Sequence, residues 1–133
     1  MATERYIEGI GRRKTATARV RITPAKATSV VVGDKPLNEY FPHQALQDDV
    51  MSVLAAEEAG IQHYTITAHV NGGGLSSQAE AIRLGIARAL VKEKADRRLV
   101  LKPLGFLKRD PRSVERKKPG LLKARRKPQW SKR

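Results

Sequence analysis

Residues 62–94 read QHYTITAHVNGGGLSSQAEAIRLGIARALVKEK. This stretch predicts a strand, a glycine loop and a helix, in that order. Residues 62–70 alternate between apolar and polar side chains, which is typical of a strand with one buried face. From Ala79 to about Lys94 the apolar residues recur at helical spacing and predict an amphipathic helix. Three glycines separate the two elements: Gly72, Gly73 and Gly74. A strand, a glycine loop and a helix start together predict an anion-binding geometry, because free backbone N–H groups and the helix dipole favour negative charge.

The same loop supports one enzyme hypothesis. The run GLSSQA at 74–79 is similar to the phosphate loop of the small-molecule kinases that include the galactose, homoserine and mevalonate kinases. Gln78 interrupts that pattern, and a chain of 133 residues has no room for their second substrate domain. No acid and lysine can be assigned as a catalytic base and a charge clamp. We therefore expect no catalytic residues, no cofactor and no enzyme activity, and keep a kinase-like phosphate-binding protein as an alternative.

Further strands and helices follow from the same kinds of pattern. Strands are also expected over 5–10, 15–22 and 28–32. Helical segments are also expected over 36–42, 43–58 and 96–104. Gly60 should end the second of these helices, and Gly9 with Gly11 is expected to bracket a turn. Ser77 and Glu80 have the spacing of a capping box for the helix that follows the glycine loop.

The strand expected after the first basic cluster has an apolar face and a basic face. Arg19 and Arg21 share the basic face with two threonines, and Arg13 is expected to continue it. The planar guanidinium fork suits phosphate oxygens, so this face is a candidate for phosphate contacts. A solvated strand face explains Arg19 and Arg21 equally well. The preceding cluster of Arg12, Arg13 and Lys14 favours phosphate contact.

Positive charge is concentrated at the C-terminal end. The chain has 27 Lys or Arg and 13 Asp or Glu, which gives a net charge of +14. Residues 1–101 hold 14 basic and 11 acidic residues, and residues 102–133 hold 13 and 2, so the balances are +3 and +11. The C-terminal segment has few apolar groups and repels itself, so it should not fold alone. A nucleic acid would supply the missing counter-charge.

The composition argues against several other classes of protein. The chain has no cysteine, which excludes disulfides and thiolate metal sites. His63 and His69 fall on the polar face of an expected strand, which explains them more simply than a metal site does. No apolar run approaches the roughly 18 residues of a membrane span. Leu121, Leu122 and Trp130 are too few to hold the C-terminal segment at a membrane surface.

Four groups of residues, in order along the chain, resemble one family. The first is GxGRRKTxxARV at 9–20, and the second is VNGGG at 70–74 with QAxAIRxGIARAL at 78–90. The third is RDxRxxERKK at 109–118, and the fourth is KARRxPQxSKR at 123–133. Together they cover essentially the whole chain. They resemble the S-nine family of small-subunit ribosomal proteins, in the bacterial or organellar form that ends in Ser-Lys-Arg.

The resemblance implies a fold and a place in the cell. The fold would be α/β, an α+β sandwich with a four-stranded, mainly antiparallel sheet and helices packed on it, like the second domain of ribosomal protein S-five. A globular rRNA-binding domain would span 1–105, and an extended basic tail would span 106–133. The protein would be cytoplasmic, in the head of the small ribosomal subunit, bound to small-subunit rRNA and beside neighbouring head proteins. A free-standing basic nucleic-acid-binding protein is the alternative.

The resemblance and the charge pattern together name the residues of the expected interface. Contacts to rRNA are expected from Arg12, Arg13, Lys14, Arg19, Arg21, Gly72, Gly73, Gly74, Arg109, Arg112, Arg116, Lys117, Lys118, Lys123, Arg125, Arg126 and Lys127. The end of the tail would approach the anticodon stem-loop of the peptidyl-site tRNA through Ser131, Lys132 and Arg133. Trp130 keeps an aromatic ring where the family more often has Phe or Tyr. No metal site is implied.

Overall fold

The computed structural model describes residues 5–56 and 63–132. The strands in this part of the chain are β1 (Ile7–Arg13), β2 (Ala16–Ala25), β3 (Ser29–Val32), β4 (Lys35–Pro36) and β5 (His63–Asn71). The helices are α1 (Leu37–Tyr40), α2 (Gln44–Ala56), α3 (Leu75–Glu93), the 3-10 helix η1 (Ala95–Arg97) and α4 (Arg98–Leu101). Gly60, which is predicted to end the second helix, lies outside the described residues.

The described strands form one mixed sheet in the order β1-β2-β5-β3-β4. Strand β2 lies antiparallel to both β1 and β5, whereas β3 runs parallel to β5. The predicted α+β class and the four predicted strands are confirmed. The predicted number of strands is wrong, because β4 adds a fifth, antiparallel to β3. Two residues, one of them Pro36, offer no alternation from which a strand could be predicted.

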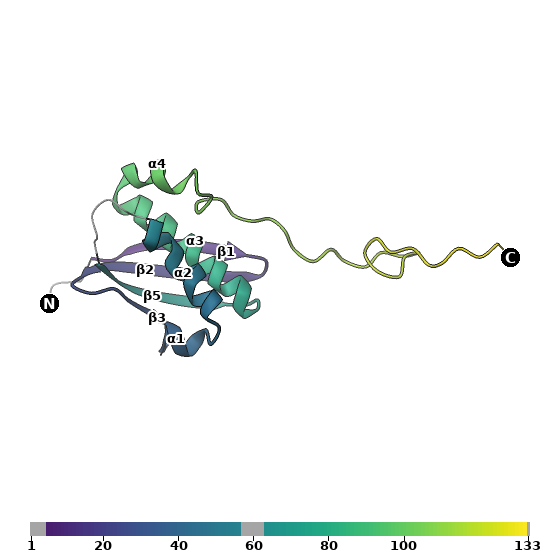
Figure 1. Ribbon diagram of the computed structural model, residues 1–133, viewed down its shortest axis with the longest axis horizontal. Helices are drawn as coiled ribbons and strands as arrows, with labels where there is room; N and C mark the ends of the chain where they lie inside the picture. The colour runs from purple at the N-terminus through teal and green to yellow at the C-terminus, as the bar shows by residue number, and fades with distance from the viewer. Residues whose placement is uncertain (1–4, 57–62, 133) are drawn as a thin grey trace.

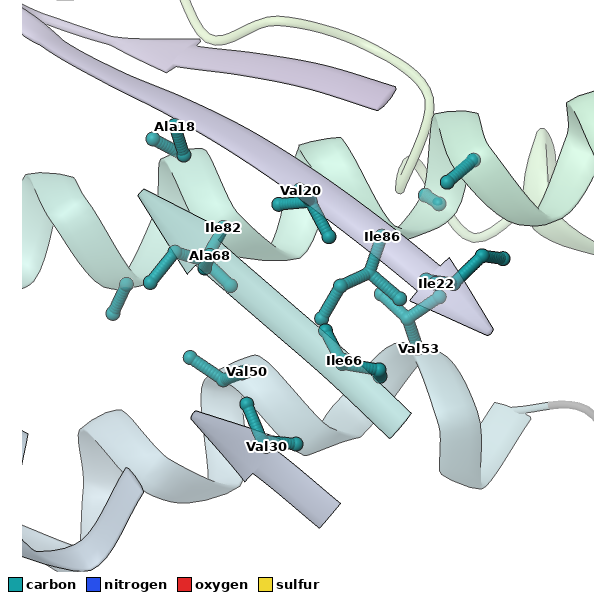
Figure 2. Close-up of a cluster of buried hydrophobic side chains, with 14 of the residues drawn as sticks. Ala18, Val20, Ile22, Val30, Val50, Val53, Ile66, Ala68, Ile82 and Ile86 are labelled. Carbon is teal, nitrogen blue, oxygen red and sulfur yellow. The ribbon is translucent and has the colours of Figure 1, made fainter. Parts of the chain in front are cut away.

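One face of the sheet carries the hydrophobic core. Alternate residues of β2 are at most 1% exposed, as the alternation predicts: Ala16, Ala18, Val20 and Ile22. Helices α2 and α3 lie together over this face of the sheet (Figure 1). Figure 2 shows the buried side chains where helices and strands meet. The helices contribute Val50, Val53, Ile82 and Ile86, and the strands contribute Val20 and Ile66. On the other face of the sheet, Arg19 is exposed and Arg21 is partly exposed.

Two glycines let helix α3 lie directly on strand β1. A Cβ at Gly9 would come within 2.2 Å of the carbonyl oxygen of Gly85, and a Cβ at Gly11 would come within 1.7 Å of that of Ala81. Both glycines are buried inside β1, so the turn predicted at Gly9 and Gly11 is wrong. The turn falls instead between β1 and β2, where Lys14 has a φ of 51°. The glycines serve close packing between a strand and a helix, which local sequence does not distinguish from a turn.

Helix α3 begins at Leu75, with Gly74 as its N-cap and no side-chain cap. The capping box predicted between Ser77 and Glu80 is therefore wrong. Ser77 is buried inside the helix, and the Glu80 carboxylate accepts a hydrogen bond from Arg13 instead. The glycines complete the turn early, so the helix starts before either residue could cap it.

Tyr64 connects strand β5 to the C-terminal end of α3. Its ring is fully buried, and its hydroxyl donates to the Glu93 carboxylate at 2.6 Å. The guanidinium of Arg97 donates to the same hydroxyl at 2.7 Å. Burial, followed by the bond to Glu93, raises the pKa of Tyr64 to about 12.

The raised pKa of Tyr64 predicts a loss of stability at high pH. The unfolded tyrosine has a pKa of about 10, so the folded state holds this proton more tightly than the unfolded state does. The Tyr64 contribution is complete below about pH 10 and should be lost as the pH rises towards about 12. Urea unfolding over this range should show a steeper fall in stability for the natural chain than for Tyr64→Phe. Equal pH slopes for the two proteins would contradict this assignment.

Beyond α4 the chain first lies on the domain and then leads away from it. Phe106 and Leu107 still pack against the core. The described residues from Lys108 onwards contain turns and bends but no helix or strand. Figure 1 shows the later part of this segment, in yellow, running away from the sheet and helices. No helix in the described part of the chain is long and apolar enough to cross a membrane.

Candidate nucleic-acid interface

The β1–β2 turn, the glycine loop and the start of the C-terminal segment meet at one end of the sheet. A Cβ at Gly72 would come within 2.7 Å of the carbonyl oxygen of Thr15, so the loop lies against the turn. The Arg109 guanidinium donates to the carbonyl of Lys14 at 3.5 Å, which places the tail beside the same turn. We call this surface the basic end; it consists of Arg12, Lys14, Gly72, Gly73, Gly74, Arg109 and Arg112. The structure therefore gathers three segments that were predicted separately to contact phosphate.

Gln78 fixes the shape of the glycine loop. Its side-chain amide donates to the carbonyl of Gly72 at 3.0 Å and accepts a bond from the hydroxyl of Tyr40 at 2.7 Å. Gly72 and Gly73 have φ values of 75° and 67°, which favour glycine. The residue that interrupts the kinase-like pattern thus holds the loop in place. The loop leads into α3, whose first N–H groups can face an anion.

Arg13 does not share a face with Arg19 and Arg21, and the prediction that it continues their face is wrong. The turn after Arg13 places it on a separate strand, on the side of β1 that faces α3. Arg13 is 9% exposed, and its Nε donates to Glu80 at 2.5 Å. Its neighbours Arg12 and Lys14 are exposed. Within the predicted cluster, these two cations are therefore the ones placed to meet an external phosphate.

Arg19 and Arg21 lie on the open face of the sheet, opposite the helices. Both donate through Nε to the carboxylate of Glu8 on the neighbouring strand, at 2.8 Å and 3.2 Å. The bond from Arg19 is the largest cause that lowers the pKa of Glu8, so the carboxylate stays ionised. Glu8 thus holds both guanidinium groups and offsets part of their charge. The Arg19 side chain is 54% exposed, and the Arg21 guanidinium lies 4.4 Å from the centre of the Tyr6 ring on the same face.

Replacement of Glu8 by Gln should strengthen binding of RNA at the open sheet face. The change removes the charge that offsets Arg19 and Arg21 and keeps a side chain of similar shape. We expect the affinity for a small-subunit rRNA fragment to rise by roughly twofold to fivefold. The slope of log affinity against log salt should steepen by up to the amount that about one phosphate contact contributes. Salt-titrated filter binding measures both quantities.

Glu39→Gln is the matched control, because Glu39 is exposed on α1 and its loss changes net charge equally. Equal effects of the two substitutions on RNA binding would show that Arg19 and Arg21 do not contact the RNA.

The C-terminal segment contains two local clusters. Asp110 accepts bonds from the backbone and guanidinium of Arg112, at 2.9 Å and 2.8 Å. Further on, the Glu115 carboxylate bonds Lys118 and, at 2.9 Å, Arg125, which closes a loop in the segment. Several tail cations form no ion pair with any described acid: Arg116, Lys117, Lys123, Arg126, Lys127 and Lys132. These groups retain their full charge for an external partner, whereas Arg133 lies outside the described residues.

Comparison with known proteins covers both the domain and the tail. The sequence profile of the family described as Ribosomal protein S9/S16 matches residues 11–133. The chain belongs to this family. Small ribosomal subunit protein uS9 of Mycobacterium tuberculosis is 47% identical over 130 residues, which cover 98% of this chain and 85% of that protein. The protein of the same name from Mycobacterium bovis shows the same 47% identity and the same coverage.

Sequence reasoning missed several residues of this S9/S16 family member that shape the interface. An open cavity of about 400 Å³ beside the basic end is lined by Arg83, Gly105, Lys108, Arg109, Asp110, Pro111 and Arg112. Arg83 and Lys108 were not predicted here, because each is one cation among many in the sequence. Asp110 offered a usable signal, since it is one of only two acids among residues 102–133. A rare acid in a cationic segment indicates an ion pair within the protein.

The histidines of this S9/S16 family member do not form a metal cluster within the described residues, where no group of three or more candidate ligands occurs. His63 lies within 3.1 Å of the hydroxyl of Thr28 through Nδ1. His69 is exposed and pairs in register with Arg19 across the sheet. Both histidines belong to the polar face of the sheet.

Proposed function

We propose that this chain is a structural constituent of the small ribosomal subunit that binds small-subunit rRNA in the head. Its membership of the S9/S16 family supports this proposal. The observation that carries it is the combination of a folded domain with a cationic segment that leads away from it (Figure 1). The last 32 residues, 102–133, carry a balance of +11, as 13 basic minus 2 acidic residues. Folded RNA supplies the phosphate that such a segment lacks.

In this proposal the contacts to rRNA fall into two groups. The basic end and the open sheet face supply contacts from the domain, and the unpaired cations between Arg116 and Lys127 supply contacts from the tail. Most of these contacts position the protein and do not read sequence, because Lys and Arg meet phosphate oxygens. Arg13 is held inside the protein by Glu80, so its contribution to rRNA binding is indirect.

The finer part of the proposal concerns the end of the tail. We assign Ser131, Lys132 and Arg133 to the anticodon stem-loop of the peptidyl-site tRNA. The eleven residues from Lys123 to Arg133 can span at most roughly 36–40 Å when extended. That length suffices to carry two charges from a peripheral domain into an RNA-filled centre. Contacts to phosphate suit this task, because the site must accept every tRNA.

Two structural expectations also belong to the proposal. The chain divides into a globular rRNA-binding domain over 1–105 and a basic tail over 106–133. We also propose that the domain shares its fold with the second domain of ribosomal protein S-five. Other head proteins are expected to pack against the domain in the assembled subunit.

Sedimentation tests the proposed function. An epitope-tagged chain expressed in cells should travel with the small subunit in a sucrose gradient and should stay there after a wash at moderate salt. A free-standing nucleic-acid-binding protein would instead spread over DNA-containing and light fractions. Absence of the tagged chain from small-subunit fractions, with the chain folded and expressed, would overturn the proposal.

A further inference from the structure

The guanidinium of Arg13 connects three parts of the chain that lie far apart in sequence. Its Nε donates to Glu80 of α3 at 2.5 Å, and one terminal nitrogen donates to the carbonyl oxygen of Arg112. The other terminal nitrogen lies 3.5 Å from the carboxylate of Asp110. All three nitrogens of one side chain, which is 11% exposed, are therefore directed at partners inside the protein. A cation whose role was to contact rRNA would keep its N–H donors free of partners inside the protein.

Arg13 holds the C-terminal end of residues 106–112, and a separate contact holds their N-terminal end. Phe106 and Leu107 pack against the core, and the guanidinium of Arg83 lies 5.9 Å from the centre of the Phe106 ring. Asp110 is fixed in turn by its bonds to Arg112, which hold its pKa well below its usual range. Residues 106–112 thus have an apolar anchor at one end and a charged anchor at the other.

The anchoring stops abruptly after Arg112. Val114 is 88% exposed. The next acid, Glu115, bonds only to tail cations, Lys118 and Arg125. Among the described charged residues from Glu115 to Lys132, the ion pairs join Glu115 to Lys118 and Arg125, and none reaches the domain.

We propose that Arg13 is a positioning residue that clasps residues 106–112 to the domain, so that the mobile part of the tail begins at Ser113. The clasp consists of Arg13, Glu80, Asp110 and the carbonyl of Arg112. All of its members belong to the protein itself, and it sets the point and direction from which the tail leaves the domain. The free tail then has 21 residues, 113–133, and can reach at most roughly 70–75 Å.

The clasp has a consequence for RNA binding that rests on the proposed function. Residues that are ordered before binding do not lose their conformational freedom during binding. Opening the clasp would release residues 108–112, which lie beyond the apolar anchor at Phe106 and Leu107. Ordering these residues again on rRNA should weaken binding by at least about tenfold.

The chemistry of Arg13 allows its position to be separated from its charge. Arg13→Lys keeps the positive charge but replaces a planar fork by one ammonium group, which cannot meet Glu80, Asp110 and the Arg112 carbonyl together. Glu80→Gln keeps the arginine and removes its shortest ion pair. Arg12→Lys is the matched control, because Arg12 is the exposed neighbour on the same strand.

Nuclear magnetic resonance of the free protein tests the clasp directly. In the natural chain we expect backbone order parameters above about 0.8 for residues 106–112 and below about 0.6 for 116–130. In Arg13→Lys and Glu80→Gln the values for 108–112 should fall towards those of the tail, whereas Phe106 and Leu107 keep their apolar packing. Trypsin cleavage after Lys108 and Arg109 should become about tenfold faster, because it follows the population of the open form. Arg12→Lys should change neither measurement.

The outcomes separate this inference from the proposed function. Unchanged order and protection of 108–112 in both Arg13→Lys and Glu80→Gln would overturn the clasp, whatever the protein binds. Equal mobility of 106–112 and 116–130 in the natural chain would also overturn it. If Arg13→Lys loses the fold, as judged by circular dichroism, Glu80→Gln decides alone. Failure to travel with the small subunit would instead overturn the proposed function and leave the clasp standing.

Discussion

A chain that ends at Trp130 is expected to join the small subunit normally and to bind peptidyl-site tRNA more weakly. The truncation removes Ser131, Lys132 and Arg133, and with them two positive charges at the end of the tail. Loss of two charge-assisted phosphate contacts should weaken tRNA binding by roughly tenfold or more. The slope of log affinity against log salt should fall by roughly 1.4 to 1.8. Filter binding of tRNA to purified subunits over a range of salt concentrations measures both effects.

A charge-matched control separates contact from overall charge. Lys26 and Lys35 are exposed on the domain, so their joint replacement by Gln removes the same charge without touching the tail. That variant should bind tRNA as the natural chain does. Truncated subunits with unchanged tRNA affinity and an unchanged salt slope would contradict the role assigned to the end of the tail.

Replacement of Gly11 by Ala is expected to produce the largest loss of stability of any Gly-to-Ala change among the described glycines. The new Cβ would lie 1.7 Å from the carbonyl oxygen of Ala81 and 2.6 Å from the backbone nitrogen of Gly85. Both obstacles are backbone atoms of α3, so the whole helix would have to move away from β1. We expect a cost of at least about 3 kcal/mol and a fall in the midpoint of thermal unfolding of at least about 12 °C.

Gly74→Ala is the control for this change. Gly74 has a φ of −96°, and a Cβ there would meet nothing within 4 Å. Its replacement should cost less than about 1 kcal/mol, through the weaker N-cap alone. Calorimetry of the two variants compares the same chemical change in crowded and open surroundings. A Gly11→Ala variant as stable as Gly74→Ala would show that α3 does not lie on β1 as described.

The elements with a clear period were predictable from the sequence. The alternation of β2 and β5 survives in the fold, because a strand with one buried face must alternate. The long helix α3 was predictable for the same reason at a different period. The two-residue strand β4 was not, since a pair of residues has no period. The capping box failed because the helix begins at Leu75, before Ser77, with Gly74 at the N-cap position and no side-chain cap.

The cations of the interface were predictable as a group but not one by one. Charge counting finds the basic tail, yet it treats Arg12 and Arg13 as equals. Only the fold shows that one is exposed and the other is bonded to Glu80 and to the tail. These partners lie 67 and 99 residues away in sequence, a separation at which local patterns carry no information. The pairing of Arg19 and Arg21 with Glu8, only 11 and 13 residues away, escaped prediction for another reason: the turn was predicted at Gly9 and Gly11, so the pairing of β1 with β2 was not foreseen.

Photo-crosslinking from position 130 tests most directly whether the tail ends in RNA. Trp130 is 81% exposed, so benzoylphenylalanine can replace it without disturbing the domain. The substituted chain is assembled into small subunits and irradiated with and without tRNA in the peptidyl site. The proposal predicts crosslinks to rRNA in both samples and further crosslinks to tRNA in the second. Crosslinks confined to residues of the protein's own domain, with none to nucleic acid, would contradict it.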